Sequence, residues 1–153
     1  MTYLPIGLRV EGAACLVVGG GTIGTRKAQT LLRAGASVTV VAPDVTDELS
    51  RLADQGHLRW EVEAFREEQL DGVLLAVVAT DDAALNGKIV ESATRCGALV
   101  CDASSSERSQ VIFGALLEEG DASIAVFTGG RNPSLARSMR DRIATLLEEE
   151  SDP

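Results

Sequence analysis

The segment Ala-Ala-Cys-Leu-Val-Val-Gly-Gly-Gly-Thr-Ile-Gly-Thr-Arg-Lys-Ala-Gln-Thr-Leu-Leu-Arg-Ala-Gly occupies residues 13–35. It opens with an apolar run, residues 15–18, that is typical of a strand buried on both faces. Gly19, Gly21 and Gly24 follow with the spacing G-x-G-x-x-G. The first glycine permits a tight turn, the second lets a pyrophosphate approach the backbone, and the third lets a helix pack close to the strand.

A helix is expected to begin near Thr22 and to end before Gly35, which suits a left-handed cap. The N–H groups at the start of such a helix favour an anion. A second strand, rich in β-branched residues, is predicted at residues 37–41. Because the glycine spacing alone is a weak signal, the order of strand, glycines, helix and strand carries the prediction of a dinucleotide site. The alternative is a tight strand-to-helix turn that binds no ligand.

The composition excludes several classes of partner. The 153 residues suit one domain with a modest appendage, and the net charge of −9 argues against nucleic acid or an anionic membrane. No apolar run approaches the ~20 residues of a membrane span, and the N-terminus lacks a signal-peptide layout. The cysteines are odd in number, and Cys15 and Cys101 fall in predicted buried strands. Reduced thiols in the cytoplasm are therefore expected.

Strands and helices continue to alternate after residue 41. Further strands are predicted at residues 57–62, 72–79 and 98–101, and further helices at residues 46–55 and 83–95. Either Asp44 or Thr46 is the expected N-cap of the first of these helices. The alternation predicts an α/β fold with a Rossmann-like, doubly wound parallel sheet.

The pattern changes after residue 110. Two apolar runs, residues 111–117 and 123–128, are typical of a hairpin, and a helix is predicted from Pro133 with Asn132 as N-cap. The apolar stripe of this helix consists of Leu135, Met139, Ile143, Leu146 and Leu147. We therefore predict an NAD-binding Rossmann domain at residues 1–110 and a small α+β dimerisation appendage at residues 111–150. The appendage is too small to cover its own apolar surface, so a homodimer is expected.

Polar loops follow four of the predicted strands, and ligands of open α/β sheets bind at the carboxyl ends of strands. Asp44 comes 20 residues after Gly24, near the distance expected of an acid that binds a ribose hydroxyl. The alternative for Asp44 is the helix N-cap. Since no arginine directly follows the second strand to hold a 2′-phosphate, NAD is favoured over NADP. Thr80 opens the loop after the strand at residues 72–79.

Other kinds of site have weaker support. The single histidine and the unpaired cysteine spacing predict no metal site. The segment from Thr128 to Ser134 joins a glycine-containing loop to a helix start and includes Arg131, which suits a carboxylate. The alternative is a dimerisation helix with surface arginines, and the two interpretations are compatible.

Four motifs together resemble the siroheme-synthase module, a precorrin-2 dehydrogenase that often doubles as sirohydrochlorin ferrochelatase. They are Gly-Gly-Gly-Thr-Ile-Gly-Thr-Arg-Lys-Ala at 19–28, Val-Val-Ala-Pro at 40–43, Ala-Thr-Asp-Asp-Ala-Ala-Leu-Asn at 79–86, and Val-Phe-Thr-Gly-Gly-Arg-Asn-Pro-Ser-Leu-Ala-Arg-Ser-Met-Arg at 126–140. The resemblance implies NAD-dependent oxidation of precorrin-2, a tetrapyrrole with eight carboxylates, by a homodimer.

Residues of the family's cofactor site carry over by position. Together with the glycine motif, the cofactor-binding prediction is Gly19, Gly21, Thr22, Ile23, Gly24, Pro43, Asp44 and Thr80. The substrate-binding prediction is Arg131 and Thr128, the latter at a position where the family has a serine or threonine.

One departure from the family affects catalysis. The family has an aspartate after the fifth strand that is thought to serve dehydrogenation and iron insertion, and an ungapped match places Ser104 there. Asp102 is the nearest earlier carboxylate and is our candidate catalytic residue. We therefore expect precorrin-2 oxidation with weak or absent ferrochelatase activity. One alternative is a regulatory module that senses NAD(H) without turnover, and another is a structural domain with an empty fold.

Overall fold

In the computed structural model, which describes residues 3–150, five parallel strands form one sheet in the order β3-β2-β1-β4-β5. The strands are β1 (Ala14–Val18), β2 (Ser37–Val41), β3 (Arg59–Glu61), β4 (Leu75–Val78) and β5 (Leu99–Asp102). The helices between them are α1 (Thr22–Arg33), α2 (Asp47–Asp54), the 3-10 helix η1 (Glu67–Leu70) and α3 (Ala83–Arg95). The predicted α/β, doubly wound fold is confirmed.

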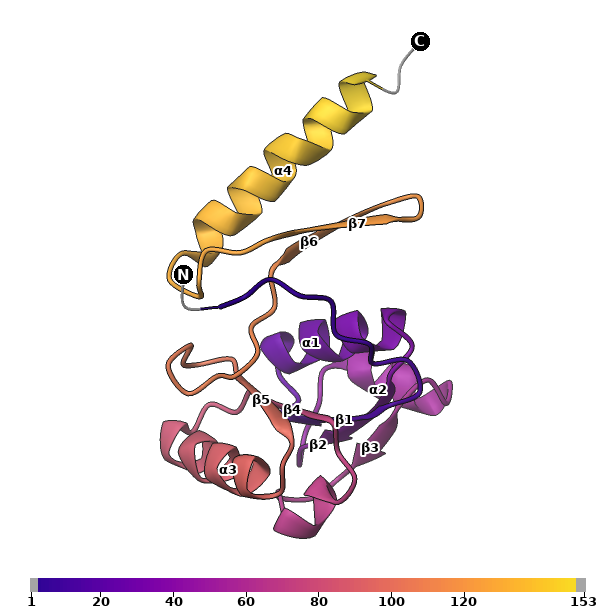
Figure 1. The fold of residues 1–153 in the computed structure, drawn as a ribbon. Coiled ribbons are helices and arrows are strands. Elements are labelled where there is room, and N and C mark those ends of the chain that lie inside the picture. The colour runs from indigo at the N-terminus through magenta and orange to yellow at the C-terminus, as the bar shows by residue number, and fades with distance from the viewer. Residues whose placement is uncertain (1–2, 151–153) are drawn as a thin grey trace. The chain divides into compact units, whose positions relative to one another are not determined.

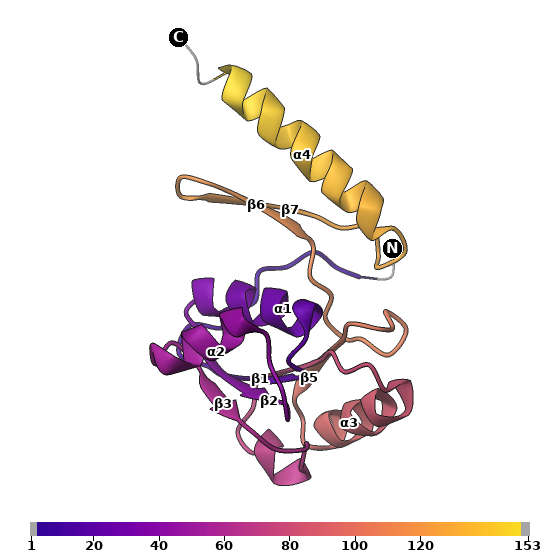
Figure 2. The same ribbon diagram turned by 180° about the vertical axis from the view of Figure 1, so that it is seen from behind.

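The helices cover the sheet on two sides. α1 and α2 lie over one face, and α3 lies over the other (Figure 1 and Figure 2). The central strands carry almost only aliphatic side chains, and all four residues of β4 are buried. Cys15 and Cys101 are buried in this core as free thiols, and Cys96 is exposed.

Two strands are shorter than predicted. β4 was predicted from residue 72 but begins at Leu75, because Gly72 has a left-handed φ of 69° that belongs to a turn. β3 was predicted over residues 57–62 but spans only Arg59–Glu61, since it is the edge strand and pairs with β2 alone.

The chain divides into two compact units, which are described separately. One consists of residues 7–111, and the other of residues 3–6 together with residues 112–150. The first predicted domain began at residue 1, whereas residues 3–6 group with the second unit.

The second unit is a hairpin with one helix. β6 (Ala115–Glu119) pairs antiparallel with β7 (Ala122–Val126), and α4 (Pro133–Glu150) packs against them. Asn132 Oδ1 accepts a hydrogen bond from Leu135 N at 2.9 Å, so the predicted N-cap is confirmed. None of the helices within residues 3–150 is long and apolar enough to cross a membrane.

Candidate functional site

The ends of four strands lie in one row at the carboxyl edge of the sheet. Val18 of β1 is in register with Val41 of β2 and Val78 of β4, and Val78 is in register with Asp102 of β5. The loops that follow these strands therefore leave the sheet side by side. This is the edge where the sequence places the ligand site.

Gly19 and Gly24 are required by the protein itself. Gly19 has a φ of +114°, and a Cβ there would lie 2.3 Å from the Ala79 carbonyl oxygen. A Cβ on Gly24 would lie 2.0 Å from the Gly19 carbonyl oxygen. Gly20, which the spacing did not single out, is equally confined, since its Cβ would lie 2.2 Å from the Asp44 carbonyl oxygen.

Gly21 is different. Its φ of −77° is accessible to any residue, and a Cβ there would meet no atom within 4 Å. Packing within residues 3–150 therefore gives no reason for glycine at this position. The free space suits a group that approaches the backbone from outside, as a pyrophosphate does.

The start of α1 lacks a side-chain cap. Gly21 is its N-cap residue and offers no side chain to the first N–H groups. The other α-helices are capped, α2 by Thr46, α3 by Asp82 and α4 by Asn132. Thr22 and Ile23 are exposed in the first turn of α1. An uncapped helix start beside the open side of Gly21 fits the phosphates of a dinucleotide.

The carboxylate of Asp44 is exposed beside this loop. Its alternative role as an N-cap is wrong, because Thr46 caps α2 by accepting a hydrogen bond from Leu49 N. Within the described part of the chain, the Asp44 side chain has no hydrogen bond or ion pair. Thr46 N donates to the Gly20 carbonyl at 3.0 Å, which fixes this loop against the glycine loop. Asp44 is therefore held beside the glycine loop with its carboxylate exposed.

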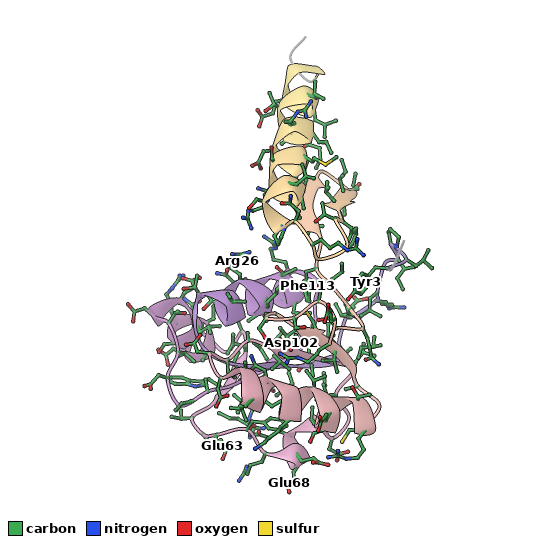
Figure 3. The ribbon with its side chains drawn as sticks, turned by 90° about the vertical axis from the view of Figure 1, so that its left-hand side faces the viewer. Tyr3, Arg26, Glu63, Glu68, Asp102 and Phe113 are labelled. Carbon is green, nitrogen blue, oxygen red and sulfur yellow. The ribbon has the colours of Figure 1, made fainter. Side chains whose placement is uncertain are left out.

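Asp102 has a different environment. Its side chain is fully buried, and it lies in the sheet layer between α1 and α3 (Figure 3). Its Oδ1 accepts hydrogen bonds from Ser104 N at 2.9 Å and from Ser104 Oγ at 2.6 Å, and its Oδ2 accepts one from Arg108 Nε at 2.7 Å. Burial alone would raise the pKa of Asp102, but these hydrogen bonds hold it below its ordinary value. The carboxylate is therefore ionised at neutral pH and has partners on both oxygens.

The comparisons with known proteins agree with this geometry. A family model described as "Putative NAD(P)-binding" matches residues 6–115. Siroheme synthase of Chromobacterium violaceum is 42% identical over 147 residues, which are 96% of this chain and 31% of that protein. Siroheme synthase of Nitrosococcus oceani is 38% identical over 149 residues, 97% of this chain and 32% of that protein. The chain belongs to the siroheme synthase family.

A solved structure extends the relationship to the fold of most of the chain. SirC, a precorrin-2 dehydrogenase, matches with a TM-score of 0.81 and 34% identity, covering 94% of this chain and 70% of SirC. This siroheme synthase module spans about a third of the length of the two siroheme synthases. It is an NAD(P)-binding domain.

Asn86 is a site residue that the sequence did not reveal. Its side chain is 1% exposed and faces inward from α3. Asn86 Nδ2 donates to the Thr80 carbonyl oxygen at 3.0 Å, and the Thr80 hydroxyl donates to Asn86 Oδ1. Asn86 Nδ2 also lies 3.4 Å from Ser104 Oγ. The available signal was a polar residue in register with the buried Ile89 and Ala93 of the same helix.

The remaining predicted residues of this family member lie in the second unit. The Thr128 hydroxyl donates to the Asn132 carbonyl oxygen at 2.8 Å, and Arg131 N donates to the Thr128 carbonyl oxygen at 3.2 Å. The structure therefore brings Thr128 and Arg131 together in the turn before α4, with Arg131 exposed. Across residues 3–150, no three His, Cys, Asp or Glu side chains form a group that suits a metal ion.

Proposed function

We propose that this chain is an NAD-dependent precorrin-2 dehydrogenase that makes sirohydrochlorin in siroheme biosynthesis. The observation that carries the proposal is the uncapped start of α1 beside the open Gly21, in a chain that is 34% identical to SirC. NAD supplies the hydride acceptor. The chain's own part is to bind the phosphates at Gly21, Thr22 and Ile23 and to orient the reacting ring at the carboxyl edge of the sheet.

We propose NAD rather than NADP as the cofactor. Asp44 is exposed beside the glycine loop and would hydrogen-bond a free ribose hydroxyl, while its charge would repel a 2′-phosphate. No lysine or arginine occurs between β2 and α2 to compensate for this charge. Pro43 of the same loop and Thr80 of the loop after β4 are proposed to line the cofactor site with it.

Ferrochelatase activity is proposed to be weak or absent. Metal insertion needs a base for the pyrrole protons within hydrogen-bond reach of the ring. Ser104, where an ungapped match places the family's aspartate, is exposed, but a hydroxyl is not ionised at neutral pH. Asp102 is ionised, but its oxygens are buried and engaged by Ser104 and Arg108.

A homodimer formed through α4 belongs to the proposal. Leu135, Met139 and Leu146 are 47%, 42% and 60% exposed. Their spacing places them along one side of the helix, whose other side packs on the hairpin. An exposed apolar stripe of this kind suits a second copy of the chain.

Arg131 and Thr128, in the turn before α4, are proposed to bind a substrate carboxylate.

A second candidate function is an NAD(H)-sensing module without turnover. The buried, engaged state of Asp102 favours it, because the candidate catalytic carboxylate is then not free to serve the reaction. Anaerobic mixing of the protein with precorrin-2 and NAD separates the two functions. The dehydrogenase produces NADH and sirohydrochlorin together, whereas the sensor binds NAD and leaves precorrin-2 unchanged.

A further inference from the structure

We infer that Arg108 binds a carboxylate of the tetrapyrrole substrate and that Asp102 is the positioning residue that orients it. The inference rests on the proposed function, because it assigns a residue to that substrate. It also gives Asp102 a role other than the acid–base role predicted from the sequence.

Arg108 is held at one side and free at the other. Its Nε donates to Asp102 Oδ2 at 2.7 Å and its Nη2 lies 3.2 Å from Ser104 Oγ. A guanidinium carries five N–H donors, so the remaining ones are not used by any partner within the described residues. The Arg108 side chain is 39% exposed, although its carboxylate partner is fully buried. A planar donor group fixed on one edge and open on the other matches a carboxylate.

Burial of the Asp102 carboxylate opposes folding unless other interactions compensate for it. Removing a carboxylate from water opposes folding, and an ion pair recovers this cost only with good geometry and further hydrogen bonds. Ser104 supplies two such bonds to Asp102. The result is a guanidinium whose orientation is set before any ligand arrives, which reduces the ordering cost of binding.

The position of Arg108 supports a substrate role. Asp102 is in register with Val78, so its loop leaves the sheet beside the loops that surround the cofactor edge. The four loops, residues 19–21, 42–46, 79–82 and 103–114, contain Asp44, Asp81, Asp82 and Glu107 but no cation other than Arg108. Arg108 is therefore the one cation of these loops that can attract a carboxylate of the substrate.

A purely structural role for Arg108 has less support, because the loop is closed by other bonds. Ser105 N donates to the Asp102 carbonyl, and Asp102 N donates to Ser109 Oγ at 2.8 Å. Gln110 N and Val111 N both donate to the Val100 carbonyl. These bonds do not involve the guanidinium. We therefore expect the loop to keep its shape when Arg108 is replaced.

The test compares Arg108→Gln, Arg108→Lys, Asp102→Asn and the double variant Asp102→Asn/Arg108→Gln in the full chain. For Arg108→Gln we expect KM for precorrin-2 to rise about tenfold or more, because one charged hydrogen-bond pair with the substrate is lost. The kcat and the affinity for NAD should change little, the melting temperature should fall because the buried Asp102 loses its ion pair, and Arg108→Lys should recover part of both losses. The control is Arg26→Gln, since Arg26 is an exposed arginine on the outer side of α1 (Figure 3).

The double variant separates the two roles of Asp102. If Asp102 acts by holding Arg108, Asp102→Asn raises KM as Arg108→Gln does, and the double variant is no worse than either single variant. If the double variant has a lower kcat than Arg108→Gln alone, Asp102 acts as a base and the inference is wrong. An unchanged KM in Arg108→Gln would also overturn it.

Binding of sirohydrochlorin, the product, distinguishes failure of the inference from failure of the proposed function. An Arg108-dependent affinity for sirohydrochlorin in a protein that does not oxidise precorrin-2 would support the inference and contradict the dehydrogenase. If replacing Arg108 changes neither turnover nor sirohydrochlorin binding, the dehydrogenase is supported and the inference is contradicted. Absence of both turnover and product binding in the unmodified protein would contradict the two together.

Discussion

The hydroxyl oxygens of Thr25 and Thr46 lie 2.8 Å apart, which links the second turn of α1 to the N-cap of α2. Thr25 Oγ1 also donates to the Gly21 carbonyl at 3.0 Å. The two threonines therefore fix the loop that carries Asp44 relative to Gly21. In the proposed cofactor site, this link sets the spacing between the acid for the ribose and the glycine for the phosphates.

Replacing Thr46 with alanine should destabilise the protein and weaken NAD binding. Loss of an N-cap costs about 1 kcal/mol of unfolding free energy, and the Asp44 loop loses its link to α1. Denaturant unfolding and calorimetric titration with NAD measure the two effects. Thr30→Ala is the matched control, because the Thr30 hydroxyl bonds only to the Arg26 carbonyl of its own helix. Equal NAD affinities in the two variants would contradict this linkage.

Asp44→Asn should reduce the preference for NAD over NADP. The amide retains a hydrogen bond to the ribose but no longer repels a 2′-phosphate. We expect tighter NADP binding and slightly weaker NAD binding, measured as dissociation constants for the two cofactors. An unmodified protein that already binds NADP as tightly as NAD would show that Asp44 does not select the cofactor.

The glycines of the loop should respond differently to alanine. Gly21→Ala should fold, with a stability cost of about 1 kcal/mol or less, and should lose at least about tenfold in NAD affinity. Gly24→Ala should fail to reach the native fold, since its Cβ would lie 2.0 Å from the Gly19 carbonyl oxygen. Circular dichroism and NAD titration of the two variants test this. Unimpaired NAD binding by Gly21→Ala would exclude the pyrophosphate from that space.

The ion pair of Asp102 should make stability depend on pH. Because its pKa is lowered in the folded state, its contribution is present above the unfolded value of about 3.9 and is lost as pH falls through the lower folded value. At neutral pH, Asp102→Asn should cost about 2 kcal/mol of unfolding free energy. The difference from the unmodified protein should shrink at acidic pH. A difference that is constant from neutral to strongly acidic pH would show that the charge of Asp102 does not stabilise the fold.

Charge on the exposed stripe of α4 should disrupt the proposed dimer. Met139→Glu places a carboxylate among the apolar side chains of Leu135 and Leu146, so the protein should become monomeric at micromolar concentration. Ser138→Glu adds the same charge to an adjacent exposed position and is the control. Sedimentation or light scattering gives the mass. A monomeric mass for the unmodified protein would contradict the dimer.

Local patterns were sufficient to predict most of the fold. The glycine loop, α3 over residues 83–95 and the N-cap Asn132 depend on neighbouring residues, and each was predictable. The choice between Asp44 and Thr46 as N-cap was not, because it depends on the turn that the loop adopts.

The environment of Asp102 was also not predictable from sequence. Its partner Arg108 is reached only because the intervening residues fold back on themselves. The environment of Asn86 was not predictable for the same reason, since its contacts come from two loops that are distant along the chain. Side-chain partners across loops are set by tertiary structure rather than by spacing.

The most direct test of the dehydrogenase assignment is an anaerobic reaction of the purified protein with precorrin-2 and NAD, with Gly21→Ala as the comparison. The account predicts that NADH and sirohydrochlorin appear in equal amounts at a rate that depends on protein concentration, and that Gly21→Ala is impaired at limiting NAD. NAD binding without any formation of NADH would contradict the account and identify the chain as a sensor.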